Sequence, residues 1–557
     1  MSDENDVELQ QKNSYSVRNG LILGALTTLP LIVLFYLGEQ IAGLPFVPFD
    51  IFDWMARILP GDVITLGIDG IVTVIDTFNL GSTSTTAKLI EQLMALVFYV
   101  VGGALFGAAI AWLLNRGLGH FVAGGIVGAA SYLFVVLVEI TLPMGDNSAA
   151  ALVWTGVLIV SWGILNGYLS YRIHGFEQIG DMQGRRRVLI GTATGSLALV
   201  IAGVGLGKLV GEDESVDVAG GSLTDLELTN TPVPEQQAYP DTNEIVDPTA
   251  AAEIDIERTR DDLDPAPGTR SELTATEDFY RIDINTRSPS IDLDEWRLET
   301  AGLFDNPRSF TLNELRQFPA VTQPITLSCI SNRVGGDLIG TSNWTGLRLK
   351  DLMEELGLQP SALELMVDSA DGFFESVILE DMTDPRTLLV YGMNDEILTD
   401  GHGFPLRIYI PNRYGMKQPK WIKQITAVGE SVMGYWVVRG WSPEAQPQIV
   451  SVIDTIAKDE PETDGLIPVG GIAWAGDRGI KNVEILIDDG DWLETDLRKP
   501  PLSQLTWVQW RYDWSPLPGK HEFKVRATDG NGDLQIEEKS GVRPDGATGF
   551  HSMDVRI

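Results

Sequence analysis

Five apolar stretches within the first 210 residues restrict what this chain can fold into. Each is close to the roughly 20 residues that an α-helix needs to cross the hydrocarbon core of a bilayer, and the run from Leu93 to Leu114 carries no charge. Small residues at 102–104 and 107–109 favour close helix packing in lipid. The stretches cover residues 20–42, 88–114, 120–142, 150–170 and 188–210. We therefore predict a membrane-bound α-helical transmembrane bundle of about five spans in residues 1–210.

Residues 44–80 are also apolar, but proline and aspartate interrupt them. Pro45, Pro48 and Pro60 each lack a backbone donor and restrict the residue before them. We expect this stretch to be a loop with interfacial pieces, and a sixth span is the alternative.

Basic residues near the ends of the spans predict the orientation of the chain in the membrane. With five spans, one side carries Lys12, Arg18, Arg116, Arg172 and Arg185–Arg187. The other side has Arg57, Lys88 and Lys208 near the span ends. The positive-inside rule then places the N-terminus in the cytoplasm and the large C-terminal part on the extracytoplasmic side of the cell membrane.

The formal net charge is −37, from 77 acidic and 40 basic residues. Binding to nucleic acid needs clustered Lys and Arg, so we expect no nucleic-acid partner. An acidic surplus this large is typical of halophilic proteins, in which salt screens the self-repulsion, and an acidic mesophilic protein is the alternative. The single cysteine, Cys329, excludes an intramolecular disulfide and a multi-cysteine zinc site.

The character of the sequence changes after the last span. Residues 211–268 are acidic, contain proline and show no sustained apolar period, which indicates a disordered or extended linker. Residues 269–446 mix short β-like runs with one helix signal, LRLKDLMEELGL, and predict an α+β domain. Residues 447–557 alternate apolar and polar residues around Asp-Gly and Asn-Gly turns, which predicts a β-sandwich.

The segment ITLSCISNRVGGDLIG is the most informative about chemistry. A strand-like run leads to Cys329, after which Asn332, Gly335, Gly336 and Gly340 permit sharp turns and close approach of the backbone. A thiolate is a good ligand for a soft or redox-active metal. Taken alone, a single cysteine is more often a small buried hydrophobic residue.

Several phrases in a fixed order resemble the molybdopterin-binding domain of the sulfite oxidase family. They are Cys-Ile-Ser-Asn, Val-Gly-Gly-Asp-Leu-Ile-Gly and Trp-Thr-Gly-Leu-Arg-Leu, followed by LLVYGMN (388–394), HGFPLR (402–407) and YGMKQPKWIK (414–423). The resemblance covers about 270–445, and the β-rich tail resembles the family's immunoglobulin-like C-terminal domain. It implies a molybdenum-dependent oxidoreductase with a molybdopterin-binding domain at 269–446 and an immunoglobulin-like β-sandwich at 447–557.

The resemblance also implies roles for individual residues. Cys329 would be the catalytic residue and the metal ligand, bound to molybdenum beside the dithiolene of one pyranopterin. The implied cofactor-binding residues are Cys329, the pair His402 and Arg407, the phosphate-side stretch Gln418, Pro419 and Lys420, and the further candidates Lys417, Tyr280, Arg281 and Ser369. A forked guanidinium and a lysine ammonium both suit a phosphate group.

Two departures from the family pattern concern the substrate pocket. Sulfite oxidases carry an arginine-asparagine-histidine phrase after the early aromatic pair, but here Tyr280 is followed by Arg281, Ile282 and Asp283. The tyrosine that the family places near the metal is replaced by Val438. These changes put sulfite in doubt as the substrate without affecting the cofactor residues. Replacement groups could come from Tyr435, Arg439 or Arg413.

We therefore predict oxygen-atom transfer on a small-molecule substrate, in the manner of a sulfite oxidase. The alternatives are a sulfoxide or N-oxide reductase of the same family and a cofactor-free membrane receptor or scaffold. The membrane part contains only His120 and His174, which gives no paired axial ligands for a b-type haem. A separate electron-transfer partner is therefore expected: a cytochrome, a copper protein or a quinone-linked subunit. A homodimer through the β-domain is a further option that the family offers.

The sequence from Gly184 to Ile190, GRRRVLI, resembles a twin-arginine export signal. An ordinary positive-inside flank is the alternative. Since the family's cofactor is inserted in the cytoplasm, the domain would have to cross the membrane folded. We predict that Arg185–Arg187 belong to a working signal and that the following span also anchors the chain.

Overall fold

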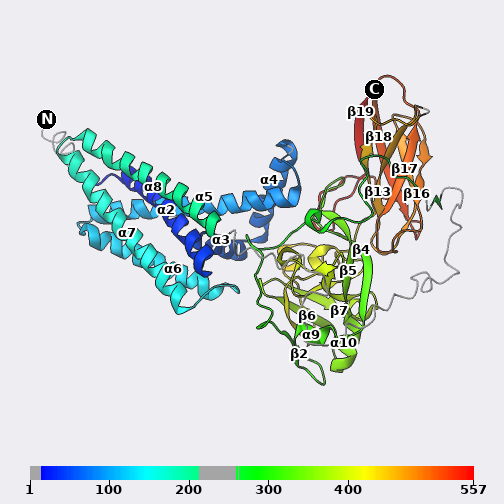
Figure 1. The fold of residues 1–557 in the computed structure, drawn as a ribbon, viewed down its shortest axis with the longest axis horizontal. Helices are drawn as coiled ribbons and strands as arrows, with labels where there is room; N and C mark the ends of the chain where they lie inside the picture. Colours follow the sequence, from blue (N-terminus) through cyan, green and yellow to red (C-terminus); the bar gives the residue numbers. More distant parts are fainter. Residues whose placement is uncertain (1–13, 79, 212–258, 261–262, 464) are drawn as a thin grey trace. The chain divides into compact units, whose positions relative to one another are not determined.

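The computed structural model describes residues 14–78, 80–211, 259–260, 263–463 and 465–557 (Figure 1). These residues form two compact units. The first contains the chain up to residue 71, the helices from residue 86 onward, and the short segment Ile284–Arg287. The second contains residues 72–85, the residues just before 284, and Ser288–Ile557. Most of the predicted linker at 211–268 lies outside the described residues.

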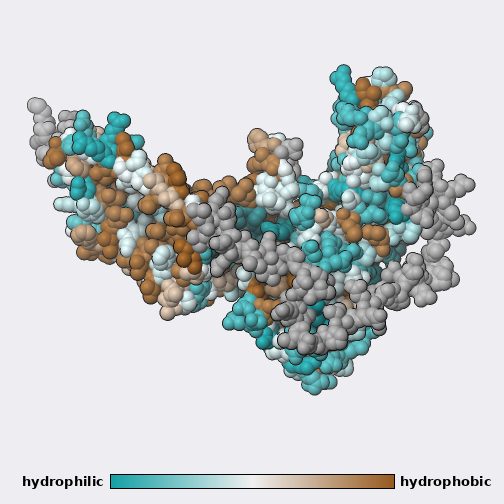
Figure 2. All heavy atoms as spheres, viewed as in Figure 1, coloured by the Kyte–Doolittle hydropathy of each residue, from teal (hydrophilic) through white to brown (hydrophobic). Residues whose placement is uncertain are grey.

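The first unit is helical. Its elements are α2 (Val17–Ala42), α3 (Val47–Ile58), the first part of α4 (Gly61–Phe78), most of α5 (Thr83–Asn115), α6 (His120–Thr141), α7 (Ala149–Gln178) and α8 (Met182–Gly211). Among them α2, α5, α6, α7 and α8 are long and apolar enough to cross a membrane. Figure 2 shows brown, apolar side chains over this unit. Leu133, Val153 and Ile201 are each about two-thirds exposed, which suits a surface that faces lipid.

The loop that we expected at 44–80 is instead two helices, α3 and α4. Pro48 lies at the start of α3, where proline is tolerated because its missing N–H has no intrahelical partner anyway. The carbonyl of Pro60 accepts hydrogen bonds from Val63 and Ile64 at the start of α4. The prolines therefore begin helices rather than interrupt a loop. Within the described residues neither α3 nor α4 qualifies as a sixth span.

Glycines allow close packing between α2 and α5. A Cβ on Gly20 would lie 2.5 Å from the carbonyl oxygen of Gly107, and Gly24 approaches Gly103 in the same way. The predicted role of the small residues in α5 is thus visible in the helix contacts. A polar pair adds to the interior, since Asn166 Nδ2 of α7 donates to Thr27 Oγ1 of α2 at 2.8 Å.

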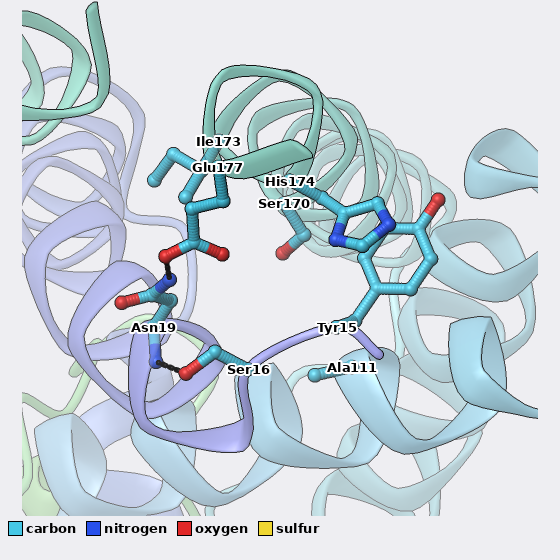
Figure 3. A pocket seen from close by; sticks show the side chains of 8 residues that line it. All are labelled: Tyr15, Ser16, Asn19, Ala111, Ser170, Ile173, His174 and Glu177. Carbon is cyan, nitrogen blue, oxygen red and sulfur yellow. Dashed lines mark hydrogen bonds between the residues drawn. The ribbon is translucent and has the colours of Figure 1, made fainter. Parts of the chain in front are cut away.

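A polar cluster joins α2, α7 and α8 where α2 begins. Asn19 Nδ2 donates to Glu177 Oε1 at 2.8 Å (Figure 3). Arg185 of α8 pairs with Glu177 at 3.1 Å and donates to Asn19 Oδ1 at 2.9 Å. Beside them lies a cavity of about 10 Å³, also lined by Tyr15 and His174, whose rings stack at 4.0 Å. A cavity of this size has room for about one water molecule.

The second unit begins with two five-stranded sheets. One has the order β10-β8-β5-β4 with β9 on β8, and the other has the order β3-β2-β11-β6-β7. The elements are β2 (Leu298–Gly302), β3 (Ser309–Phe310), α9 (Leu312–Leu315), β4 (Ala320–Ser328), β5 (Ile339–Arg348), α10 (Leu349–Leu356), β6 (Glu364–Ser369), β7 (Phe374–Ile378), α11 (Leu379–Thr383), β8 (Leu388–Met393), β9 (Glu396–Ile397), β10 (Arg407–Tyr409) and β11 (Ile422–Val428). The predicted helix is α10: Leu349, Leu352, Met353 and Leu356 are buried and Gly357 ends it in the left-handed conformation.

The C-terminal part is formed by two further sheets that share one apolar core. Their orders are β1-β16-β17-β13-β12 and β15-β14-β18-β19. The strands are β1 (Thr259–Arg260), β12 (Val450–Ile456), β13 (Ile467–Trp474), β14 (Ile480–Ile487), β15 (Trp492–Glu494), β16 (Asp496–Arg498), β17 (Val508–Trp514), β18 (Lys520–Asp529) and β19 (His551–Arg556). This is a β-rich domain of two layers, and its immunoglobulin-like classification stays a prediction.

Candidate active site

Cys329 directly follows β4, at the point where the strand turns. Its N–H donates to the Leu338 carbonyl at 2.9 Å, and its own carbonyl accepts from the Asn332 N–H at 3.0 Å. The Asn332 side chain closes the same turn by accepting the Leu338 N–H at 3.0 Å. The thiol sulfur lies 3.0 Å from the Ser331 hydroxyl and is buried. The turn therefore holds the sulfur in one place.

Two buried tyrosines lie near this thiol. Burial raises the pKa of the Tyr280 hydroxyl well above its usual value; the nearby Cys329 raises it further and Arg407 opposes it. Burial likewise raises the pKa of Tyr414 to about 12, and Cys329 contributes. Gly415 lets the chain pass close by, since a Cβ there would lie 3.1 Å from the Tyr280 oxygen. Both phenols therefore stay protonated at neutral pH and can donate hydrogen bonds.

Among the described residues, the Cys329 thiol is not part of a cluster of protein metal ligands. Within the described ranges, no group of three or more His, Cys, Asp and Glu side chains could hold a metal ion. Burial raises the pKa of the Cys329 thiol, and the hydrogen bond from Ser331 opposes this. A bound cation would favour the thiolate form of this side chain.

A cationic cluster surrounds His402, which ends a short 3₁₀ turn (η4, Asp400–His402). Burial lowers the pKa of His402 to about 3, and Arg407, Lys420 and Arg281 lower it as well. Its Nε2 lies 3.1 Å from the Thr276 carbonyl oxygen. The imidazole is therefore neutral at neutral pH and donates to that carbonyl.

The three cations reach this place from separate segments. Arg407 begins β10, donates to the His402 carbonyl at 3.0 Å and lies 4.8 Å from the centre of the Trp344 ring. Lys420 Nζ donates to the Gly401 carbonyl at 3.1 Å and lies 3.6 Å from Asp283. Arg281 packs on Gly401, where a Cβ would lie 2.5 Å from Arg281 Nη1. Three positive groups around a neutral imidazole, one of them also near Asp283, could hold an anion such as a phosphate.

Two predicted residues present polar atoms without a partner among the described residues. Ser369, at the end of β6, is 1% exposed and its Oγ is unpaired there. Gln418 is 3% exposed; its Nε2 donates to the carbonyls of Ile410 and Arg413, while Oε1 has no such partner. The Ala370 N–H donates to the Trp421 carbonyl, which ties the two segments together. Buried polar atoms of this kind fit the hydrogen-bonding edge of a pterin.

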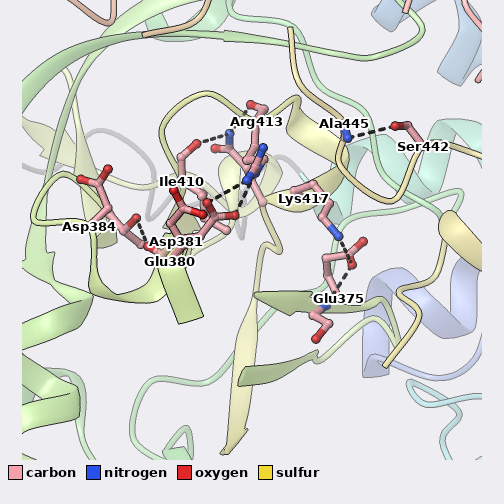
Figure 4. A network of polar contacts seen from close by, with 12 residues as sticks. Glu375, Glu380, Asp381, Asp384, Ile410, Arg413, Lys417, Ser442 and Ala445 are labelled. Atoms are coloured by element: carbon pink, nitrogen blue, oxygen red, sulfur yellow. Dashed lines mark hydrogen bonds and ion pairs between the residues drawn. The ribbon is translucent and has the colours of Figure 1, made fainter. Parts of the chain in front are cut away.

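The remaining predicted residues take structural positions. Pro419 is buried and its carbonyl accepts the Ile408 N–H at 3.1 Å. Lys417 is bound by Glu375 at 2.7 Å (Figure 4), a partner that sequence reasoning missed. Arg413 makes two hydrogen bonds to Asp381, at 2.8 and 3.0 Å. Lys417 and Arg413 are thus already neutralised within the protein, and a role of Lys417 toward the cofactor stays a prediction.

A cluster of arginine and aromatic side chains was only partly predicted. The Arg439 guanidinium lies 3.6 Å from the centre of the Tyr435 ring and donates to the Tyr435 carbonyl at 2.8 Å. Arg543, from the C-terminal domain, lies 5.0 Å from the Trp441 ring and donates to the Arg439 carbonyl at 2.9 Å. Trp441 shares a buried cluster with Ile330, the neighbour of Cys329. Val438, in contrast, is 51% exposed.

Comparison with known proteins matches residues 285–436 to the oxidoreductase molybdopterin binding domain. Sulfite oxidase of Arabidopsis thaliana is 26% identical over 285 residues, which cover 42% of this chain and 72% of that protein. Mitochondrial sulfite oxidase of Drosophila melanogaster is 25% identical, covering 51% of this chain and 59% of that protein. The uncharacterized oxidoreductase YuiH of Bacillus subtilis is 29% identical over 156 residues, which cover 28% of this chain and 77% of its own length. The matched range contains Cys329, His402, Arg407 and Lys420.

Proposed function

We propose that this chain, which is a sulfite oxidase-like molybdopterin oxidoreductase, transfers an oxygen atom to or from a small anionic substrate at a membrane, with Cys329 as the protein's ligand to molybdenum. The observation that carries the proposal is that one domain contains both a buried thiol and a cluster of cations. A single buried thiol lies beside two protonated tyrosines, and three cations converge around His402. Each feature matches one end of a molybdenum cofactor: a metal that needs one thiolate, and a phosphate that needs positive charge.

The residues have separate tasks toward the cofactor. The cofactor, when bound, supplies the two-electron oxygen-atom exchange. Cys329 would bind the metal as a thiolate, which the Ser331 hydroxyl at 3.0 Å from the sulfur would stabilise. Arg281, Arg407 and Lys420 would hold the phosphate, while Ser369 Oγ and Gln418 Oε1 would form hydrogen bonds with the pterin edge. His402 fixes the loop between these groups through its contacts with Thr276 and Arg407.

The substrate class follows from the arginines near Trp441. Among the described residues Arg543 Nε is buried and has no hydrogen-bond partner, and no ion pair with a carboxylate is seen for this side chain. A buried guanidinium with an unmade hydrogen bond favours an anion. Arg543 and Arg439 thus replace the arginine phrase that is missing after Tyr280, and sulfite or a related sulfur oxyanion fits this charge.

Membrane attachment rests on the five apolar helices, and the basic flanks favour a catalytic domain outside the cytoplasm. Electrons must pass to or from a separate cytochrome, copper protein or quinone-linked subunit. In the helical unit His120 stacks on Tyr171 and His174 stacks on Tyr15, so each imidazole has an aromatic neighbour rather than a facing histidine. This arrangement does not suit bis-histidine haem ligation.

Metal and pterin analysis of the purified full chain, followed by a dye-linked assay, tests the proposal. We expect molybdenum and pterin in equal amounts and oxidation of sulfite. In Cys329→Ser we expect the thermal unfolding of the wild type with turnover lost, because the hydroxyl preserves the volume but is a poor ligand for this metal.

Three results would contradict parts of the proposal. A chain that binds neither metal nor pterin would be a receptor or scaffold. Reduction of sulfoxides or N-oxides without sulfite oxidation would assign the enzyme to the reductases of this family. Substantial turnover in Cys329→Ser would refute the role of the thiol.

A further inference from the structure

The segment Ile284–Arg287 packs with the helical unit, although the residues on both sides of it belong to the second unit. We call this segment the strap. Asn285 and Thr286 are 4% and 1% exposed, so the strap is buried against the helices that hold it. A surface tether between two domains is normally solvated, because its backbone polar groups would otherwise need partners. The backbone polar groups of the strap do have hydrogen-bond partners in the helices.

Asp53 of α3 binds Thr286 at two points. The Thr286 N–H donates to Asp53 Oδ1 at 2.9 Å and the hydroxyl donates to Oδ2 at 3.2 Å. The Thr286 carbonyl accepts from Gln92 Nε2 of α5 at 3.1 Å. The N–H, hydroxyl and carbonyl of one buried residue are therefore all satisfied by side chains from two helices. This geometry recognises both the backbone and the side chain.

Asn285 is held in the same way. Arg57 donates to Asn285 Oδ1 at 2.6 Å, and the Lys88 ammonium donates to the Asn285 carbonyl. The side-chain amide of Asn285 lies 3.1 Å from Met144 Sδ. Hydrogen bonds from charged donors are stronger than neutral ones, so the two cations contribute binding and not only shape.

Arg287 inserts into a socket of two acidic and two aromatic side chains. It pairs with Glu39 at the end of α2, and its guanidinium lies 3.6 Å from Asp50. The rings of Phe46 and Phe49 lie 5.7 and 5.4 Å from the guanidinium carbon. Burial lowers the pKa of Arg287 to about 10, so the side chain remains charged at neutral pH. The Glu39 carboxylate and two aromatic faces suit a guanidinium, whereas burial and the nearby Glu139 raise the pKa of Asp50 well above its usual value.

We propose that Glu39, Asp50, Asp53, Arg57, Lys88 and Gln92 form a binding site for the strap, and that the helical unit uses it to fix the chain at the start of the cofactor-binding region. The helices are then a docking unit for a defined peptide of their own chain, in addition to an anchor. The six residues of the site come from α2, α3 and α5, so the strap also ties these helices together. Ile284 directly follows Asp283, which contacts Lys420 of the cationic cluster.

Hydrogen–deuterium exchange of the full chain in lipid nanodiscs tests the site. In Asp53→Ala we expect the amides of residues 284–287 to exchange about tenfold faster or more, because the bound carboxylate closes the segment. The matched control is Asp62→Ala, which removes an exposed acid at the start of α4 and should leave this peptide unchanged. Thr286→Val is a second test variant, because it removes the hydroxyl that binds Asp53 and leaves the helices unchanged.

A charge exchange makes the test specific. Arg287→Glu should lose protection of the strap, and the pair Glu39→Arg with Arg287→Glu should recover it in part. Strap exchange that is equally fast in the wild type and all variants would overturn the proposal. Equal protection in the wild type, Asp53→Ala, Thr286→Val and Arg287→Glu would overturn it as well, because burial alone would then hold the segment.

Discussion

Replacing Lys417 by Met distinguishes a structural role of this lysine, as the partner of Glu375, from a role in binding the cofactor. Its ammonium lies 2.7 Å from Glu375, whose side chain is fully buried, while the Lys417 side chain is 10% exposed. Glu375 Oε1 also accepts the Ser376 N–H at 2.9 Å, and Oε2 has no hydrogen-bond partner among the described residues. Lys417→Met leaves this carboxylate buried without its cation. We expect a loss of about 3–5 kcal/mol in unfolding free energy, the usual cost of breaking a buried pair from one side.

The double variant Lys417→Met with Glu375→Gln is the control. Glutamine removes the buried charge, so most of the loss should return, to within about 1–2 kcal/mol of the wild type. Burial raises the pKa of Glu375, and Lys417 lowers it. Without Lys417 the pKa rises further above the unfolded value of about 4.3. The deficit of Lys417→Met relative to the wild type should therefore be largest at neutral pH and shrink as the pH falls through the raised pKa, where the folded carboxyl gains a proton.

Urea unfolding of the full chain in detergent, followed by tryptophan fluorescence at several pH values, measures these differences. Molybdopterin content is measured on the same samples. Lys417→Met that keeps wild-type stability and loses the cofactor would refute the reasoning. Lys417 would then contact the cofactor, as the sequence resemblance implies, and its pairing with Glu375 would be incidental.

Three further predictions concern other parts of the molecule. The pKa of His402 falls from about 6.5 in the unfolded chain to about 3 in the fold, so the stability of the fold is fully present above the unfolded pKa and is lost as the pH drops toward the folded pKa. His402→Gln in the cofactor-free protein should remove this loss, which is about 2 kcal/mol at pH 5. An unchanged dependence of stability on pH in the variant would contradict this. Arg185→Lys and Arg186→Lys should both trap the catalytic domain inside the cell, as measured by protease protection. Only Arg185→Lys should also lower the thermal stability, because Arg185 binds Glu177 and Asn19 whereas Arg186 is exposed. Normal export of both variants would exclude the export signal. Arg543→Gln should raise the KM for sulfite by about tenfold to a hundredfold, the loss of a charge-assisted hydrogen bond, and an unchanged KM would remove Arg543 from the substrate site.

Local patterns in the sequence predicted much of this fold. The apolar spans, the helix at Leu349–Leu356 and the strand that leads to Cys329 all follow from periodicity over a few residues. The same reasoning was wrong for 44–80, because proline has two effects. It breaks a helix from within, but it also starts one. Pro48 and Pro60 take the second position, which the sequence does not distinguish from the first.

Long-range partners were beyond the reach of these patterns. Glu375 and Lys417 are 42 residues apart, and Arg439 and Arg543 are 104 residues apart. Such pairs depend on which strands and loops the topology brings together. The cluster of Arg281, His402, Arg407 and Lys420 was anticipated only through the family resemblance, because spacing alone cannot show that Arg281 reaches the turn at Gly401. The strap at Ile284–Arg287 has no local signal at all.

X-ray absorption at the molybdenum edge tests whether the metal is bonded to the protein's single thiol. The measurement compares the wild type with a Cys329→Ser sample that contains the same amount of molybdenum and pterin. We predict one sulfur ligand fewer in the variant, replaced by a shorter bond to a light atom. Identical sulfur coordination in the two samples would show that Cys329 is not a ligand.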